Sequence, residues 1–145
     1  MLTRMCIGAL AVVASVSLAS CGSPAEAPHA TSTGASAASV VQHRLVGPDE
    51  FATAIGESDR TTINVHVPFE GDIAGTDLSI PFDRITERAD QLPADRGAPI
   101  AIYCRTGPMS ATAAETLKSL GYTDVVELKG GLKAWQASGR PLVGN

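Results

Sequence analysis

Cys104 lies between an apolar run at residues 99–104, PIAIYC, and a helical pattern that begins near Ser110. A short loop before a helix can turn its N–H groups inward to form an anion site, and the helix N-terminus adds about half a positive charge. Gly107 permits backbone conformations that other residues disfavour, and Arg105 adds a formal cation. The segment therefore predicts a thiol with a stabilised anionic form, which attacks a substrate and then holds a charged product.

The other polar residues near this cysteine have alternative roles. Thr106 and Ser110 could donate hydroxyl groups to a bound anion, and Ser110 could equally be only a helix cap. Met109 either lines an apolar entrance or fills space. His66 ends a predicted strand on the same sheet edge, so it either faces the pocket or is a structural histidine. The predicted substrate-binding loop comprises Arg105, Thr106, Gly107, Pro108, Met109 and Ser110.

Strand-like and helix-like segments alternate along the chain and must position this loop. Short β-branched or apolar runs predict strands at residues 40–46, 61–67, 99–104 and 124–128. Apolar residues spaced three and four apart predict helices at 47–58 and 82–92. Good helix formers followed by Gly121 predict a helix at 110–121, a last short helix is expected at 132–139, and the stretch 68–81 is irregular. The pattern predicts an α/β fold with a central parallel sheet and helices on both faces, whose ligands bind at the carboxyl ends of the strands.

The N-terminal part has the composition of a targeting segment and a tether. Residues 1–20 have one positive charge, an apolar stretch and a small-residue end, which predicts a signal peptide. The stretch LASC, ending at Cys21, resembles a bacterial lipobox, which implies cleavage before Cys21 and its lipidation. An ordinary secretory signal with a chance cysteine is the alternative. Residues 21–39 would form a lipidated N-terminus and flexible linker, and residues 40–145 the folded domain.

The composition favours some classes of function and disfavours others. The 145 residues carry a net charge of −4 and have no lysine- or arginine-rich run, so nucleic-acid binding has no electrostatic basis. No histidine and cysteine cluster has metal-ligand spacing, and no glycine-rich nucleotide motif is present. We therefore expect neither a metal nor another cofactor, and we expect a monomer.

Three motifs resemble those of the rhodanese family. CRTGPMS, at Cys104, looks like the family's active-site loop, whose common form is Cys-Arg-Thr-Gly followed by a polar residue, Arg and Ser. LKGGLKAWQASGRP resembles the family's terminal signature, and INVHVPFEGDIAGTDLSIP is similar to its early signature. The resemblance covers residues 40–145. It implies the rhodanese α/β fold and sulfur transfer through a persulfide on Cys104.

The sequence departs from the family pattern at charged positions. Met109 replaces the second loop arginine, and Asn64 and His66 stand where the early signature has Asp and Arg. These changes remove a loop cation and predict weaker use of a dianionic donor such as thiosulfate. They leave the nucleophile and the loop N–H groups unchanged.

These observations predict a sulfurtransferase that takes sulfane sulfur from thiosulfate or a persulfide and passes it to a thiol or cyanide. It would be anchored to a membrane through Cys21, facing the periplasm or the outside of the cell. The alternative is a catalytically weak or inactive binding module at the cell envelope. A tyrosine-phosphatase activity is disfavoured, because that reaction needs an arginine six positions after the cysteine and position 110 is Ser.

Overall fold

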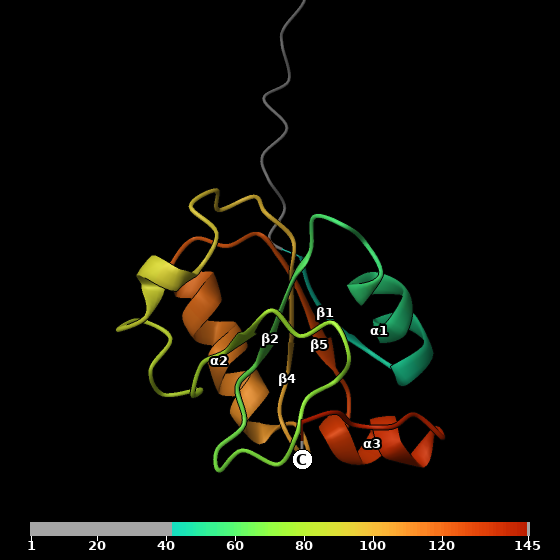
Figure 1. The fold of residues 1–145 in the computed structure, drawn as a ribbon. Coiled ribbons are helices and arrows are strands. Elements are labelled where there is room, and N and C mark those ends of the chain that lie inside the picture. Colours follow the sequence, from blue (N-terminus) through green and yellow to red (C-terminus); the bar gives the residue numbers. More distant parts are fainter. Residues whose placement is uncertain (1–41, 145) are drawn as a thin grey trace, which may run out of the picture. The chain divides into compact units, whose positions relative to one another are not determined.

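A five-stranded parallel sheet forms the centre of the computed structural model, which describes residues 42–144 (Figure 1). The strand order is β1-β5-β4-β2-β3, which confirms the predicted parallel sheet. The predicted strand at 61–67 ends earlier, at Asn64, although the N–H of Val65 still donates to the carbonyl of Tyr103. The strands are β1 (Gln42–Val46), β2 (Thr61–Asn64), β3 (Leu78–Ser79), β4 (Ile100–Tyr103) and β5 (Asp124–Leu128).

Helices cover both faces of the sheet, as the sequence predicts (Figure 1). Helix α2 (Pro108–Ser119) packs on one face, while α1 (Pro48–Ile55) and α3 (Gly131–Ala137) pack on the other. Among the described residues, no helix is long and apolar enough to cross a bilayer.

The central strand β4 shows how the core is divided between the two faces. Its four residues are fully buried, because helices cover both sides of the sheet. Ile100 and Ile102 pack in the cluster under α2, whereas Ala101 and Tyr103 pack in the cluster under α1 and α3. This alternation follows from the two-residue period of a strand. It fixes the end of β4, and therefore Cys104, in the middle of the sheet's carboxyl edge.

The predicted helix at residues 82–92 is wrong. The segment is a series of turns that ends in a short 3₁₀ helix, η1 (Ala89–Gln91). Its first N–H, from Phe82, bonds to the carbonyl of Val65, which holds the start of the segment against the residues that follow β2. Ile85 and Leu92 are still buried, because successive turns can repeat an apolar contact every three residues as a helix does. The pattern therefore predicted the burial and not the backbone.

Helix α2 begins two residues before the predicted start. Pro108 occupies the first turn, where its missing N–H costs no hydrogen bond and its fixed φ suits a helix. Gly107 precedes it with φ of 126°, a conformation that favours glycine. The turn between β4 and α2 is consequently tight.

The structure does not describe residues 1–41. The predicted signal peptide, Cys21, the linker and the start of the first predicted strand therefore lie outside the described residues.

Candidate active site

The loop after β4 directs several hydrogen-bond donors at the sulfur of Cys104. The N–H of Gly107 donates to Sγ at 3.0 Å, and the N–H groups of Thr106 and Ser110 help to lower the pKa of this thiol. The Ser110 hydroxyl lies 3.4 Å from the same sulfur. The positive φ of Gly107 turns the chain back on itself, so that N–H groups from the loop and from the first turn of α2 converge on one atom.

These donors set the protonation of the thiol. Burial by itself would raise the pKa of Cys104, because an anion loses its hydration. The Ser110 hydroxyl and the N–H groups of Ser110, Gly107 and Thr106 outweigh burial, and the pKa of Cys104 lies below its usual value. A larger fraction of the group is therefore thiolate at neutral pH, which is the nucleophilic form.

Helix α3 holds the same loop from the opposite side. The N–H of Leu132 donates to the Cys104 carbonyl at 2.9 Å, and the N–H of Lys133 donates to the Arg105 carbonyl at 3.1 Å. Gly131 packs against this backbone so closely that an added Cβ would lie 2.1 Å from the Cys104 oxygen. The loop carbonyls thus face α3 while its N–H groups face the sulfur. The sequence gave no sign of this contact.

A cavity of about 230 Å³ opens over Cys104. Cys104 is only 1% exposed, so a substrate reaches the sulfur through this cavity. Gly107 and Ser110 lie outside the lining: Gly107 donates from the loop, and Ser110 is fully buried behind the sulfur. The lining residues are His66, Cys104, Arg105, Thr106, Pro108 and Met109.

Ser110 is not the helix cap that the sequence offered as one of its roles. Gly107 occupies the cap position, and no side chain caps the helix there. The Ser110 hydroxyl lies 2.8 Å from the Gly107 carbonyl and 2.7 Å from a carboxylate oxygen of Glu127. Because Ser110 is fully buried, its hydroxyl contacts the Cys104 sulfur, the Gly107 carbonyl and Glu127 and not solvent.

His66 faces the pocket and contacts Met109. Its Nδ1 lies 3.4 Å from the Met109 sulfur, and its side chain is 5% exposed. Asn64 orients this part of the chain: its side-chain oxygen accepts the N–H of His66 at 2.9 Å, and its amide donates to Asp72 at 2.8 Å. The neutral Asn64 therefore anchors the backbone on which His66 stands.

Sequence reasoning missed Glu70, which lies at the rim of this site. Its carboxylate is 3.0 Å from Nε of Arg105 and 3.5 Å from Nε2 of His66. The cation of Arg105 is therefore paired with an anion instead of being directed at the pocket alone. A lone glutamate in an irregular stretch gives no sequence signal for the contact with Arg105, since Glu70 and Arg105 are far apart in the chain.

Glu127 is a second residue that sequence reasoning missed. It stands in β5 and is 3% exposed. One carboxylate oxygen accepts the Ser110 hydroxyl, and the other lies 3.0 Å from Nε2 of His43 on β1. A charged residue inside the apolar pattern DVVEL was the available signal, because glutamate is seldom buried without a partner.

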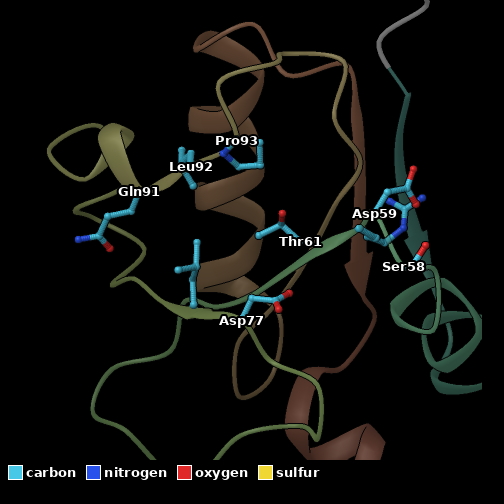
Figure 2. Close-up of a pocket in the computed structure, with 9 residues that line it drawn as sticks. Ser58, Asp59, Thr61, Asp77, Gln91, Leu92 and Pro93 are labelled. Carbon is cyan, nitrogen blue, oxygen red and sulfur yellow. The ribbon is translucent and has the colours of Figure 1, made fainter.

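A larger hollow, of about 390 Å³, lies at the amino edge of the sheet, where β2 begins at Thr61 (Figure 2). Its lining includes Asp77 and Gln91 but no cysteine or histidine. Within residues 42–144, no group of three or more His, Cys, Asp or Glu side chains is arranged to hold a metal.

A family model described as a rhodanese-like domain matches residues 61–138, which include Cys104 and its loop. The chain belongs to the rhodanese family. A sulfurtransferase from Allochromatium vinosum is 39% identical to this rhodanese over 66 residues, which are 46% of this chain and 60% of the relative. The thiosulfate sulfurtransferase PspE of Escherichia coli is 34% identical over 73 residues, 49% of this chain and 69% of the relative.

Solved structures agree with the family assignment. A rhodanese-related protein from Thermoplasma volcanium superimposes with a TM-score of 0.58 at 31% identity, covering 69% of this chain and 97% of that protein. The agreement confirms the predicted rhodanese α/β fold. Because the match spans only 60% of the Allochromatium protein, what that whole protein does is not carried over with the fold.

Proposed function

We propose that this rhodanese is a sulfurtransferase that forms a persulfide on Cys104. The observation that carries the proposal is the convergence of loop N–H groups on the Cys104 sulfur, which lowers the pKa of the thiol. The names of the relatives from Allochromatium and E. coli support the reaction class. Such donors stabilise negative charge on sulfur both before and after it accepts a second sulfur atom.

In the first half-reaction the Cys104 thiolate attacks the outer sulfur of a donor. A bond forms between the two sulfur atoms, the sulfur–sulfur bond of the donor breaks, and the leaving sulfite or thiolate takes the electron pair. In the second half-reaction a thiolate or cyanide attacks the outer sulfur of the persulfide. The bond to Cys104 then breaks, and its electron pair restores the thiolate.

The charges around the cavity favour a persulfide donor over thiosulfate. Arg105 is the only arginine or lysine among the lining residues, and Glu70 pairs with it at 3.0 Å. Met109 contributes no charge at the position where the family has an arginine. A dianion therefore finds little net positive charge here, whereas the single charge of a persulfide can be held by the N–H groups of the loop.

The same ion pair supports a second candidate function. A rhodanese whose loop cation is neutralised by Glu70 could bind a partner at the cell envelope without turnover. The state of the thiol separates the two candidates. A thiol that reacts with an alkylating agent at neutral pH supports the enzyme, and one that reacts only in alkaline solution supports the binding module.

We also propose that the protein is exported and anchored through a lipid on Cys21. The apolar segment at residues 1–20 and the LASC motif support this location. Cells fed labelled palmitate should incorporate the label into the wild type and not into Cys21→Ser. Equal labelling of both would overturn the anchor and leave the sulfur chemistry unaffected.

Mass spectrometry tests the sulfur transfer directly. The purified protein is incubated with thiosulfate or with a small-molecule persulfide, and the peptide that contains Cys104 is weighed. The wild type should gain the mass of one sulfur atom and lose it again when a thiol is added, and Cys104→Ser should gain nothing. A wild type that never gains sulfur from either donor, or a Cys104→Ser variant that gains it equally, would overturn the proposal.

A further inference from the structure

A chain of polar side chains runs from the Cys104 sulfur away from the substrate cavity. The sulfur lies 3.4 Å from the Ser110 hydroxyl, which lies 2.7 Å from Oε1 of Glu127. Oε2 of Glu127 lies 3.0 Å from Nε2 of His43. These residues come from the loop after β4, from α2, from β5 and from β1, so three neighbouring strands of the sheet position the chain.

Burial makes this chain unusual. Ser110 is fully buried and Glu127 is 3% exposed, on the face of the sheet that α2 covers. A buried carboxylate is costly unless it is paired and hydrogen-bonded. His43 is the outer member, with a side chain 32% exposed, so the chain links the buried sulfur to solvent on the side away from the cavity.

The Ser110 hydroxyl has one hydrogen and three acceptors that compete for it: the Cys104 sulfur, the Gly107 carbonyl and Glu127. With Glu127 ionised, the hydroxyl donates to the carboxylate, and its oxygen can accept the S–H of Cys104. With Glu127 protonated, the carboxylic acid donates to the hydroxyl, which is then free to donate to a Cys104 thiolate. The two arrangements differ only in the position of protons along the chain.

We propose that Glu127 is the proton acceptor for Cys104 and acts through Ser110. The S–H bond of Cys104 breaks as its proton moves to the Ser110 oxygen, and the original hydroxyl proton moves to Oε1 of Glu127. The products are a thiolate, an intact hydroxyl and a neutral carboxylic acid, so atoms and charge balance. His43 holds the second carboxylate oxygen and keeps Glu127 oriented. The inference rests on the nucleophilic role of Cys104 proposed above.

The charged and titratable groups that face this chain are few. His43 on β1 is the one beside Glu127, while the register neighbour on β4 is the apolar Ile102. On the cavity side of the sulfur stand His66, Arg105 and their shared partner Glu70. These three groups lie on the cavity side of the sulfur, and variants of Glu127 leave them in place.

The rate of iodoacetamide alkylation, followed from about pH 5 to about pH 9, tests the proposal without any sulfur donor. In the wild type the Cys104–Glu127 pair shares one proton, so the rate should vary by less than tenfold per pH unit near neutrality. In Glu127→Gln the thiol must lose its proton to solvent. At about pH 6 the alkylation rate of Glu127→Gln should be about tenfold lower than that of the wild type. As the pH increases from there, the rate of the variant should rise about tenfold per pH unit.

Ser110→Ala breaks the link and keeps the Glu127–His43 contact. It should show the same loss as Glu127→Gln, and the double variant should lose nothing further, because both changes interrupt one path. Glu115→Gln, on the exposed face of α2, is the matched control and should follow the wild type. Melting temperatures of all variants separate a change in folding from a change in the thiol.

A Glu127→Gln profile that overlays the wild type or lies above it would overturn the proposal. In that case Glu127 does not accept the proton of Cys104, and its carboxylate only competes with the sulfur for the hydrogen of the Ser110 hydroxyl. Additive losses of alkylation rate in the double variant would overturn the proposal as well. If Glu127→Gln does not fold, a Ser110→Ala profile that overlays the wild type would overturn it. Persulfide formation is measured separately, so a wild type with the expected pH profile but without sulfur uptake would overturn the proposed function alone.

Discussion

The hollow at the amino edge of the sheet encloses about 390 Å³, and the cavity at the carboxyl edge encloses about 230 Å³. At the amino edge two of the charged side chains that line the hollow have partners within the protein: Arg60 contacts Glu57 and Asp124, and Asp77 accepts the N–H of Thr62. At the carboxyl edge a loop and a helix N-terminus direct N–H groups at one sulfur. The direction of the strands, more than the volume of the hollow, therefore decides where chemistry can occur.

Each edge also has an ion pair between an arginine and a glutamate. Arg60 is buried, with a side chain 3% exposed, and it pairs with Glu57. It also contacts the carbonyl of Ile100 on β4 and the carboxylate of Asp124 on β5, so Arg60 helps to hold these strands together. Arg105 is 47% exposed, and its pair with Glu70 stands at the mouth of the candidate site. We expect the first pair to affect stability and the second to affect reactivity.

The largest expected effect comes from Gly131→Ala. The new methyl group would overlap the Cys104 carbonyl, and residue 131 has φ of 55°, which side chains disfavour. We expect the loop to be displaced and alkylation of Cys104 at neutral pH to slow by about a hundredfold, a loss of about 3 kcal/mol of stabilisation. Gln91→Ala, in the hollow at the amino edge, is the control. If Gly131→Ala folds and reacts at the wild-type rate, the loop does not depend on α3.

Glu70→Gln should have a smaller effect and in the opposite direction. The substitution releases the Arg105 cation, so persulfide formation from thiosulfate should rise roughly fivefold, since an exposed ion pair is worth about 1 kcal/mol. Glu57→Gln removes the matching carboxylate at the amino edge and should leave this rate unchanged. Equal effects of the two substitutions on the rate would contradict the difference between the edges.

The smallest effect is a dependence of stability on pH. The pKa of Cys104 is lowered in the folded protein, because hydrogen bonds to the sulfur outweigh burial. Between the folded pKa and the unfolded value of about 8.5 the unfolded chain binds more protons, so stability rises with pH. Urea unfolding of the wild type and of Cys104→Ser should therefore give a difference that is fully present above the unfolded pKa. It should be lost as the pH falls through the folded pKa.

Much of the fold follows from local sequence patterns. The runs that become β4 and β5 are short and apolar, and they are bounded by turn residues, so their strands are predicted almost to the residue. The loop at Cys104 is also predictable, because a glycine and a proline between a strand and a helix leave few conformations. The segment at 82–92 failed because apolar spacing alone does not tell a helix from successive turns.

The charged neighbours of the site could not be predicted from the sequence. Glu70 and Glu127 reach the site through contacts between distant segments, with Arg105 and with Ser110. Local patterns contain no information on such pairs. Of the two, only Glu127 gave a sequence signal, because it is a charged residue inside a predicted buried strand. The sequence did not indicate that Ser110 is its partner.

The carbonyl groups of the reactive loop bond to α3, which is the last helix among the described residues. While α3 is not docked, we expect Cys104 to be an ordinary thiol, because the N–H groups around it are not yet aligned. The nucleophile forms only when α3 docks. Loss or unwinding of α3 would therefore lower the reactivity of the Cys104 thiol without any chemical change to the cysteine.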